Sequence, residues 1–441
     1  CKIDNSKLSL PLNKLEHITQ YNETSCAFIL RILAGQGISF YFHHSSNQHT
    51  MVLLDSGSTP AQYTNFIDLG CPHHSNEPIY FYPRATVTAE QFSQNQYNYL
   101  QPQTNLLLLQ KSKCKRKQIF KQPLEQHCFP GMYQQKSQGD KKLDQLARRE
   151  DQQSLTYQSA SHSCAFHPGL KLHVIDKNQQ HNTFIITSIE HTIVDQTGLD
   201  ALALSEQAAQ HYSNCFTCLK QSSIPLPALK DTPQMLSSQT ATVIGHAGQD
   251  IHTDHLARIK VRFHWDRYYQ SNPNQAGWIR CKQMLAGNKH GCLFLPRVGS
   301  EVIVDFIDND PDRPIVTGQV YNSHNNTPFN LEENYTGGLQ SRTFKTADKH
   351  DGNILRFNDK SDEEELWIHA QKNLHIIAGN NFNSSVKQNE SEMIIKGNKN
   401  ITVKNDYELT ANTKISFQCG KSTITMDKSC INILGESIAI N

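Results

Sequence analysis

The sequence predicts a mainly β protein that ends in a narrow, oligomeric rod. Apolar-x-apolar pairs recur about every eight residues through 363–441, with polar turns between them. Five short strand patterns also follow one another within 241–325. Period-two alternation is typical of strands, and a fixed period across many units indicates a repeat architecture.

The strands of this C-terminal repeat have one apolar face and almost nothing in the same chain to bury it against. The turns are too short for a helix or a returning sheet, and an isolated ribbon would leave its edges unpaired. Several identical chains wound around one axis, each with its apolar face inward, resolve both problems. At a strand spacing of roughly 4.8 Å, about ten units give a rod on the order of 50 Å long. A single-chain β-solenoid or a β-sandwich is the alternative that the repeat leaves open.

The apolar positions of the repeat form the predicted core of the rod. They occur in pairs on one strand face, and their spacing tightens from eight to seven near the end. These positions are Leu366, Ile368, Leu374, Ile376, Met393, Ile395, Ile401, Val403, Leu409, Phe417, Ile424, Ile431, Ile433, Ile438 and Ile440.

The composition argues against several functional classes. The 441 residues carry a formal net charge of +1, which gives no general attraction to nucleic acid or membranes. No apolar run reaches the roughly 18 residues that a transmembrane helix needs, and no basic-then-apolar leader is visible. The chain begins with Cys1 instead of Met, so we expect the native N-terminal portion to be missing. The 12 cysteines show no pairing pattern, which favours reduced thiols in a cytoplasmic fold.

Residues 1–223 are predicted to form strands with two helices between them. Thr24 and Ser25 can cap the first helix, and Gly35 is expected to stop it. The predicted helices cover 26–33 and 141–151. The predicted strands cover 37–42, 50–54, 80–82, 106–109, 170–174 and 184–189.

Two short motifs in this region are explained without a binding site. The basic run 111–117 has no interleaved aromatic residues, so we expect a solvated face and not a nucleic-acid site. Cys215 and Cys218 form a C-x-x-C motif, but neither a βαβ frame nor a second cysteine pair accompanies it. We therefore interpret them as two unrelated cysteines.

A Pro- and Ser-rich stretch at 224–240 predicts a linker and a domain boundary. The five strand patterns that follow indicate a small Greek-key barrel of the OB type. They lack the exposed aromatic and basic surface that nucleic-acid binding needs, so no nucleic-acid partner is expected. The patterns lie at 241–245, 258–266, 277–282, 301–306 and 310–322.

Three groups of side chains contain residue types that are common in metal sites. One opens like a calcium loop, but Arg313 stands where the loop needs glycine, so we predict a turn held by Asp side chains. The spacing of the other two fits no standard zinc site. Neither a G-x-S-x-G elbow nor a P-loop occurs, and we predict no metal, no cofactor and no catalytic residue. The groups are Asp308, Asp310 and Asp312; His252, Asp254 and His255; and Cys71, His73 and His74.

Longer motifs occur in one order along nearly the whole chain. They lie at 20–24, 28–31, 35–42, 49–55, 251–254, 294–299, 310–322, 337–342, 353–359 and 364–373. In this order and spacing they resemble VgrG, the spike family of the bacterial type VI secretion system. The fit is weakest over 57–163. Leu285 also departs from the family, which has Trp before the Ala-Gly pair.

The resemblance implies a hub of β-barrels with a few helices, an OB-fold barrel and a C-terminal intertwined trimeric β-helix needle. The apolar positions of the repeat would then be the needle core and the trimerisation surface. The implied parts are a hub at 1–223, a linker at 224–240, an OB-fold at 241–325, a neck at 326–362 and a needle at 363–441.

The resemblance further implies a mechanical function without enzymatic activity. A homotrimer would sit on a ring of the Hcp tube, carry a PAAR-type protein at its tip, and contact baseplate and effector proteins. Sheath contraction would drive it through a target membrane. It would be assembled in the bacterial cytoplasm and secreted into the extracellular space or target cell without a signal peptide.

Two other functions are left open by the residues. A phage tail or an extracellular contractile injection particle uses a similar hub and needle. A cell-wall or polysaccharide hydrolase on a β-scaffold would need paired carboxylates at glycosidase separation, and 363–365 is the only dense acidic run.

Overall fold

The fold is mainly β and divides into two compact units, Cys1–His369 and Ala370–Asn441. The computed structural model describes residues 2–9, 17–69, 80–114, 122–176, 178–194, 212–221, 224–269, 272–345 and 351–437. Within these ranges two α-helices accompany the strands, which confirms the predicted fold class. No helix among the described residues is long and apolar enough to cross a membrane.

The first helix, α1 (Ser25–Gln36), begins and ends at well-defined caps. The side chain of Thr24 accepts a hydrogen bond from the Ala27 N–H at 3.1 Å, as predicted for this cap. The predicted stop at Gly35 is wrong. Gly35 continues the helix, and Gly37 ends it because Gly37 adopts the left-handed φ of 74° that favours glycine.

A hairpin follows α1, as the alternating sequence predicts. Strands β2 (Ser39–Ser45) and β3 (Gln48–Leu54) pair antiparallel around the expected polar turn. Strand β1 (Lys2–Asp4) adds to the other edge of β3 in parallel. Val52 and Leu54 of β3 pack with Ile224, so the Pro-rich stretch begins in contact with this hairpin.

The largest sheet has six strands in the order β4-β10-β11-β12-β9-β5. Its aromatic and aliphatic core includes Phe166, Leu172 and Phe216. Strands β10 and β11 pair antiparallel, as predicted for 170–174 and 184–189. The strands are β4 (Gln62–Asp68), β5 (Phe81–Ala85), β9 (Leu155–Ser161), β10 (Lys171–Ile175), β11 (His181–Ile193) and β12 (Tyr212–Leu219).

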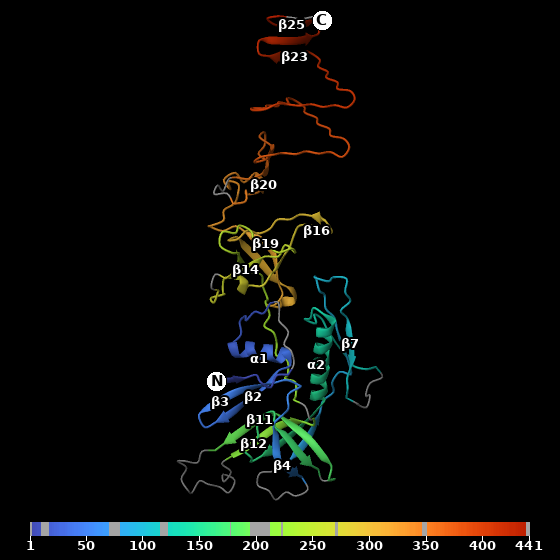
Figure 1. The fold of residues 1–441 in the computed structure, drawn as a ribbon, viewed down its shortest axis with the longest axis vertical. Helices are drawn as coiled ribbons and strands as arrows, with labels where there is room; N and C mark the ends of the chain where they lie inside the picture. The colour runs from blue at the N-terminus through green and yellow to red at the C-terminus, as the bar shows by residue number, and fades with distance from the viewer. Residues whose placement is uncertain are drawn as a thin grey trace. The chain divides into compact units, whose positions relative to one another are not determined.

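Helix α2 (Lys136–Ser154) covers a small three-stranded sheet and lies beside β7 in Figure 1. Leu143 and Ala147 face this sheet and are buried against Phe92. The helix predicted at 141–151 is confirmed and extends further at both ends. The sheet consists of β6 (Gln91–Gln94), β7 (Leu108–Lys111) and β8 (Glu125–Cys128).

The OB-type barrel forms from a five-stranded sheet in the order β14-β13-β18-β19-β15. Ile259 and Ile279 exchange backbone hydrogen bonds of 2.9 and 2.8 Å, which ties the β14 edge to the β15 edge and closes the sheet. Val243, Val302 and Val304 are buried inside. The predicted strands correspond to β13 (Gln239–Ile244), β14 (Lys260–Phe263), β15 (Arg280–Cys281), β18 (Glu301–Phe306) and β19 (Pro314–Val320).

The first unit ends in a short antiparallel meander of three strands. These strands are β20 (Thr336–Gln340), β21 (Ile354–Asn358) and β22 (Glu365–His369). A small hairpin, β16 (Ala286–Gly287) and β17 (His290–Gly291), belongs to the same unit. Two short 3-10 turns, η2 (Pro273–Gln275) and η3 (Ile307–Asn309), connect barrel strands.

The second unit contains extended chain followed by a three-stranded antiparallel sheet. Gly420, with φ of 57°, lies in the tight connection between the first two strands. The strands are β23 (Lys414–Cys419), β24 (Ser422–Asp427) and β25 (Ile431–Leu434).

Candidate functional site

The C-terminal sheet presents one apolar face. Phe417 on β23 lies opposite Ile424 on β24, which lies opposite Ile433 on β25. Directly opposed residues of an antiparallel pair share a face, so these side chains form one row. A second row on the same face consists of Ile415, Met426 and Ile431.

This apolar face is open to solvent in the single chain. The side chains of Phe417, Ile424 and Ile433 are 53%, 43% and 50% exposed. The opposite face is polar except for Leu434, and there the hydroxyl oxygens of Ser416 and Thr425 lie 3.4 Å apart. A sheet that is apolar on one face must bury that face against another layer. The described part of the second unit offers no such layer, so the arrangement is suited to receive another chain.

The predicted core positions between 370 and 413 stand on extended chain without strands. The expectation that each pair lies on a strand is therefore not met within one chain. A strand requires a hydrogen-bonding neighbour, and the described residues supply none here. Met393 and Ile395 are each 85% exposed, so these side chains also lack an apolar partner. The other exposed positions of this group are Leu374, Ile376, Ile401, Val403 and Leu409.

The remaining predicted core residues lie elsewhere. Leu366 and Ile368 are exposed on β22, in the meander of the first unit. Ile438 and Ile440 lie outside the described residues. Of the predicted set, the structure thus brings together Phe417, Ile424, Ile431 and Ile433 on one sheet face.

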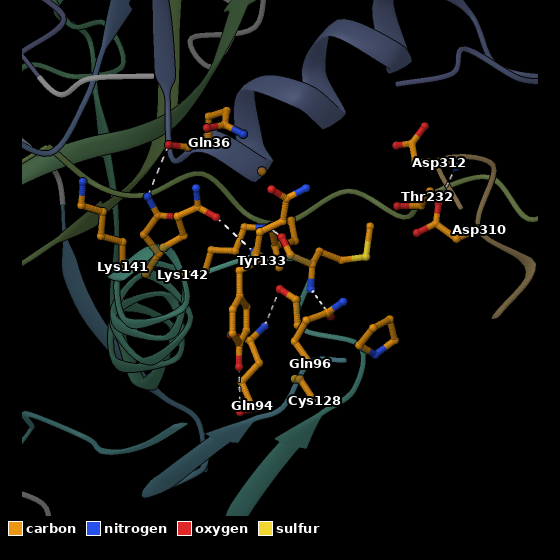
Figure 2. A pocket seen from close by; sticks show the side chains of 18 of the residues that line it. Gln36, Gln94, Gln96, Cys128, Tyr133, Lys141, Lys142, Thr232, Asp310 and Asp312 are labelled. Carbon is orange, nitrogen blue, oxygen red and sulfur yellow. Dashed lines mark hydrogen bonds between the residues drawn. The ribbon is translucent and has the colours of Figure 1, made fainter. Parts of the chain in front are cut away.

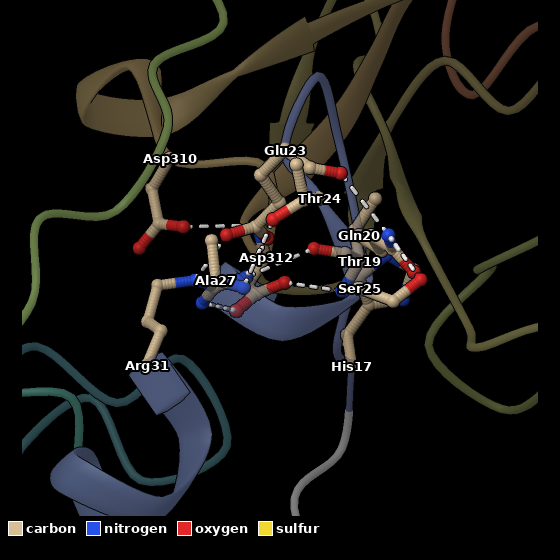
Figure 3. Close-up of polar contacts among 10 residues, drawn as sticks. All are labelled: His17, Thr19, Gln20, Glu23, Thr24, Ser25, Ala27, Arg31, Asp310 and Asp312. Carbon is tan, nitrogen blue, oxygen red and sulfur yellow. Dashed lines mark hydrogen bonds and ion pairs between the residues drawn. The ribbon is translucent and has the colours of Figure 1, made fainter. Parts of the chain in front are cut away.

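A second candidate site joins helix α1 to the turn between η3 and β19 of the barrel, and Figure 3 shows it from close by. Arg31 donates a hydrogen bond to Glu23 Oε1 at 2.8 Å and forms a longer ion pair with Asp312 Oδ2 at 3.7 Å. The Thr19 N–H donates to Asp312 Oδ1 at 2.6 Å. Asp310 accepts a hydrogen bond from the Asp312 N–H at 2.9 Å. We call these five residues the Arg31 junction.

The Arg31 junction places more acids than bases in a partly buried site. Burial raises the pKa of Asp312 to about 6, and the neighbouring Asp310 adds to this rise. The Thr19 N–H and the Arg31 guanidinium favour the charged form and oppose it. A carboxyl with this pKa changes its charge between mildly acidic and neutral pH.

Tyr99 makes a further contact between the N-terminal region and the barrel. Its hydroxyl group accepts a hydrogen bond from Arg258 Nη1 at 2.8 Å. The Arg280 guanidinium lies 4.3 Å from the centre of the Tyr99 ring, in cation–π geometry. Together with the Arg31 junction, this contact holds the barrel against residues that precede it by more than 150 positions.

These junctions were not predicted from the sequence. Two charged motifs in the sequence could have indicated these contacts. They are Glu23 with Arg31, and Asp310 with Asp312, and the charges within the motifs are only partly balanced by their neighbours in sequence. Pairing them requires knowing that the turn after η3 lies beside the start of α1, and the sequence separation of nearly 300 residues hides that proximity.

The groups that imitate metal sites are held by neighbouring protein groups where the structure describes them. In the Asp-rich turn, Asp308 pairs with Arg313, and Asp310 holds the Asp312 amide, which confirms the predicted turn. Asp254 accepts hydrogen bonds from the backbone and side chain of Arg258. The group of Cys71, His73 and His74 lies outside the described residues. Among the described side chains, no cluster of three or more His, Cys, Asp or Glu could hold a metal ion.

The C-x-x-C motif lies on β12 and its two thiols are free. Cys215 is exposed and Cys218 is buried. Because residues three apart on a strand point to opposite faces, the two sulfurs cannot meet. Burial also raises the pKa of Cys218 to about 12, which makes this thiol a poor nucleophile and metal ligand.

Comparison with known protein families divides the chain into three matches. A family model described as the phage tail baseplate hub (GPD) matches residues 2–197. The type VI secretion system/phage-baseplate injector OB domain matches 243–321, and the bacteriophage T4 gp5 C-terminal trimerisation domain matches 337–429. The OB match coincides with the closed barrel, and the trimerisation match includes β23 and β24 of the apolar face.

Two curated relatives come from Pseudomonas aeruginosa. The type VI secretion system spike protein VgrG1a is 29% identical over 98% of this chain and 71% of its own length. The spike protein VgrG1b is 32% identical over 84% of this chain. This chain spans 50% of the length of VgrG1b.

A solved structure from E. coli is also similar. It is a component of the type VI secretion system and is described as structurally similar to the T4 tail proteins gp27 and gp5. The two chains are 16% identical, with a TM-score of 0.42 over 69% of this chain and 62% of that one.

Proposed function

The chain belongs to the VgrG family of type VI secretion spike proteins, and on this premise we propose that it is a structural puncturing spike. In this function a trimer transmits axial load from a contracting sheath and carries effectors through a target membrane. The work is mechanical, because a rod held by contacts between chains bears load without any chemistry.

The apolar face of β23, β24 and β25 is the observation that carries this proposal. Three copies of one-sided sheets can bury these faces against each other around an axis. The match to a trimerisation domain across 337–429 supports the same association. Each apolar side chain removed from water in this way contributes about 1.5–3 kcal/mol when fully buried.

The proposed partners follow from the family. The N-terminal hub would sit on a ring of Hcp, the C-terminal end would receive a PAAR-type tip protein, and baseplate and effector proteins would bind the assembled trimer. The membrane contact would be transient. We place assembly in the bacterial cytoplasm and the final location outside the cell or inside the target cell.

We also propose that the chain itself is not an enzyme. The described residues contain no cluster that could hold a metal, and the strongest charged cluster, the Arg31 junction, joins two structural elements. Purified protein should therefore leave peptidoglycan and polysaccharides intact. Release of soluble fragments that disappears when a single carboxylate is changed would contradict this.

A trimer in solution is the first test. Three chains of 50.1 kDa should give a light-scattering mass of about 150 kDa. Ile424→Asn places an amide on the apolar face and should shift the protein toward monomer. Thr425→Asn is the matched control, because Thr425 is the next residue of β24 and lies on the polar face.

The outcome of this experiment separates the competing architectures. A chain shortened to end at residue 362 should lose the trimer or hold it weakly. A full-length chain that is monomeric at micromolar concentration would contradict the spike and favour a single-chain β-fold. A trimer that Ile424→Asn and Thr425→Asn affect equally would show that this face is not the contact.

A further inference from the structure

Ring contacts of the barrel meet at His252, which lies on the loop that follows strand β13. Its imidazole lies nearly parallel to the Trp278 indole, with 4.9 Å between the ring centres. His246 meets the same imidazole edge-on at 4.9 Å. The Lys260 ammonium lies 4.8 Å from the centre of the Trp278 ring and donates to the Pro273 carbonyl at 2.9 Å. A positive charge on His252 would therefore lie near one lysine and a second histidine.

The hydrogen bonds of His252 determine which ring nitrogen carries the proton. Nδ1 lies 2.9 Å from Gln249 Oε1, and the His246 N–H donates to this same oxygen at 3.2 Å. An amide oxygen only accepts, so Nδ1 is the donor and the neutral ring has no proton on Nε2. Nε2 is buried and has no hydrogen-bond partner among the described residues. A proton added to Nε2 would therefore find neither an acceptor nor water.

Protonation of His252 is consequently unfavourable while the rings stay stacked. Burial, then His246 and Lys260, lower the pKa of His252 below its ordinary value of 6.5. An imidazole turned out into water returns to that ordinary value. Between the two pKa values the open form binds a proton that the closed form does not, so acidification shifts the equilibrium toward the open form.

The loop that carries His252 also holds the segment that follows strand β20. Asp250 Oδ2 accepts from the Lys345 N–H at 3.0 Å, and Asp250 Oδ1 lies 3.3 Å from Arg342 Nη2. Arg297 Nη1 lies 3.3 Å from Asp250 Oδ2, and Arg297 Nη2 donates to the Arg342 carbonyl at 2.5 Å. The Lys345 N–H, with Arg342 and Arg297, holds the pKa of Asp250 below its usual range. This carboxylate therefore stays charged while His252 titrates.

Trp278 borders open space. It lines a cavity of about 760 Å³ beside helix α2. Figure 2 shows other side chains of the cavity wall, including Lys141 and Lys142 of α2 and Asp310 and Asp312 of the barrel. Because the indole lies at a cavity and not within a close-packed core, the His252 ring can leave it without opening a void among packed side chains.

We propose that the loop 245–252 is an acid-sensitive latch between the barrel and the segment 342–345. At neutral pH the stacked His252 ring keeps the loop closed and Asp250 in contact with that segment. When His252 takes up a proton its ring turns out to water, and Asp250 releases the segment. The segment lies within the region 337–429 that matches the trimerisation domain. The latch forms within one chain, so it goes beyond the proposed spike function and does not depend on it.

Hydrogen exchange of the Lys345 amide reports on the latch, because its acceptor is Asp250 Oδ2. The full chain is compared at pH 7.5 and pH 5.5 by mass spectrometry, and each rate is divided by that of an unstructured reference peptide. One proton can raise the opening constant by up to about tenfold over this interval, so protection of this amide should fall about threefold to tenfold. The Ile259 N–H, bonded within the barrel, should keep its protection within about twofold. A change of less than about twofold at Lys345, or an equal loss at Ile259, would overturn the latch.

Two variants assign the pH dependence. His252→Asn keeps a side-chain N–H near the position of Nδ1 but does not titrate, so protection of the Lys345 amide should be equal at both pH values within about twofold. His255→Asn is the matched control, because it removes an exposed histidine from the same loop and should retain the full dependence. Asp312, which also titrates in this interval, is present in all three proteins and cannot cause a difference between them. Dependence that persists in His252→Asn, or that both variants lose, would overturn the proposal.

His252→Phe provides a second variant in case His252→Asn fails to fold. It keeps a ring that can stack on Trp278, cannot titrate, and should likewise make protection of the Lys345 amide independent of pH. The light-scattering mass is measured on the same samples, so dissociation of a trimer is seen separately from opening of the latch. A wild-type monomer with the expected pH dependence would contradict the spike and support the latch. Protection that falls only in samples that dissociate would assign the change to the trimer and overturn the latch.

Discussion

The carboxyl group of Asp312 connects the barrel to the region around helix α1. It receives the Thr19 N–H from before α1 and an ion pair from Arg31 within α1. Its pKa is raised from 3.8 to about 6, chiefly by burial. Between these two values the folded protein binds a proton at this position that the unfolded chain has released. The contribution of Asp312 to the free energy of unfolding therefore falls as pH rises from about 4 to about 6.

Asp312→Asn should remove that dependence. On acidification from pH 6.5 to pH 4, we expect the melting temperature of the wild type to rise more, or to fall less, than that of the variant. The reason is that the amide side chain of the variant takes up no proton. Carboxyls whose pKa is lowered in the folded state, such as Asp254, affect stability at a lower pH than Asp312 does. Their contribution to the free energy of unfolding is lost as pH falls through their folded pKa. The prediction fails if the melting curves of the two proteins differ by the same amount at both pH values.

At the scale of elements, the strongly patterned segments are predictable from sequence and the context-dependent ones are not. The alternation in 170–174 and 184–189 and the apolar side of α2 determine those elements locally. Strand β12 escapes prediction because its alternation is interrupted by polar residues and it is defined by pairing with β9 and β11. The repeat over 370–413 predicts strands, but strands depend on neighbours that one chain does not supply here.

The candidate sites divide in the same way. The apolar row through Phe417, Ile424 and Ile433 follows from period-two alternation alone. The Arg31 junction does not, because a pairing across nearly 300 residues depends on the tertiary fold. Local sequence also could not decide between Gly35 and Gly37 as the end of α1, since both are glycines near the same turn.

The end of α1 gives a paired test of helix termination. Gly37→Ala should lower the free energy of unfolding by about 1–3 kcal/mol, because a non-glycine residue at this positive φ is strained. Its Cβ would also lie 2.6 Å from Gln145 Nε2. Gly35→Ala should be neutral or stabilise by up to about 1 kcal/mol, since Gly35 is helical and its Cβ would meet nothing within 4 Å. Denaturant titration measures both, and a larger loss for Gly35→Ala would contradict the assigned helix end.

For the whole molecule, trimerisation makes stability depend on concentration. Anything that binds the folded state stabilises it by mass action, and here the ligand is another copy of the chain. The C-terminal thermal transition should therefore move to higher temperature as the protein is concentrated from about 1 to about 100 μM. Calorimetry on the wild type and on Ile424→Asn distinguishes the cases. A transition that stays at one temperature in the wild type, or that moves equally in Ile424→Asn, would exclude association through this face.

Residues 414–434 leave the ribosome only after the first unit has been made. At synthesis rates of about 5–20 residues per second, that unit has time to fold before the apolar sheet emerges. Until two further copies bind, the exposed apolar face of this sheet can associate with any unfolded chain nearby and start aggregation. Ribosomes following one another on the same messenger deliver matching copies at short range. Producing all three chains from a single transcript is therefore a protection against aggregation that the one-sided sheet makes valuable.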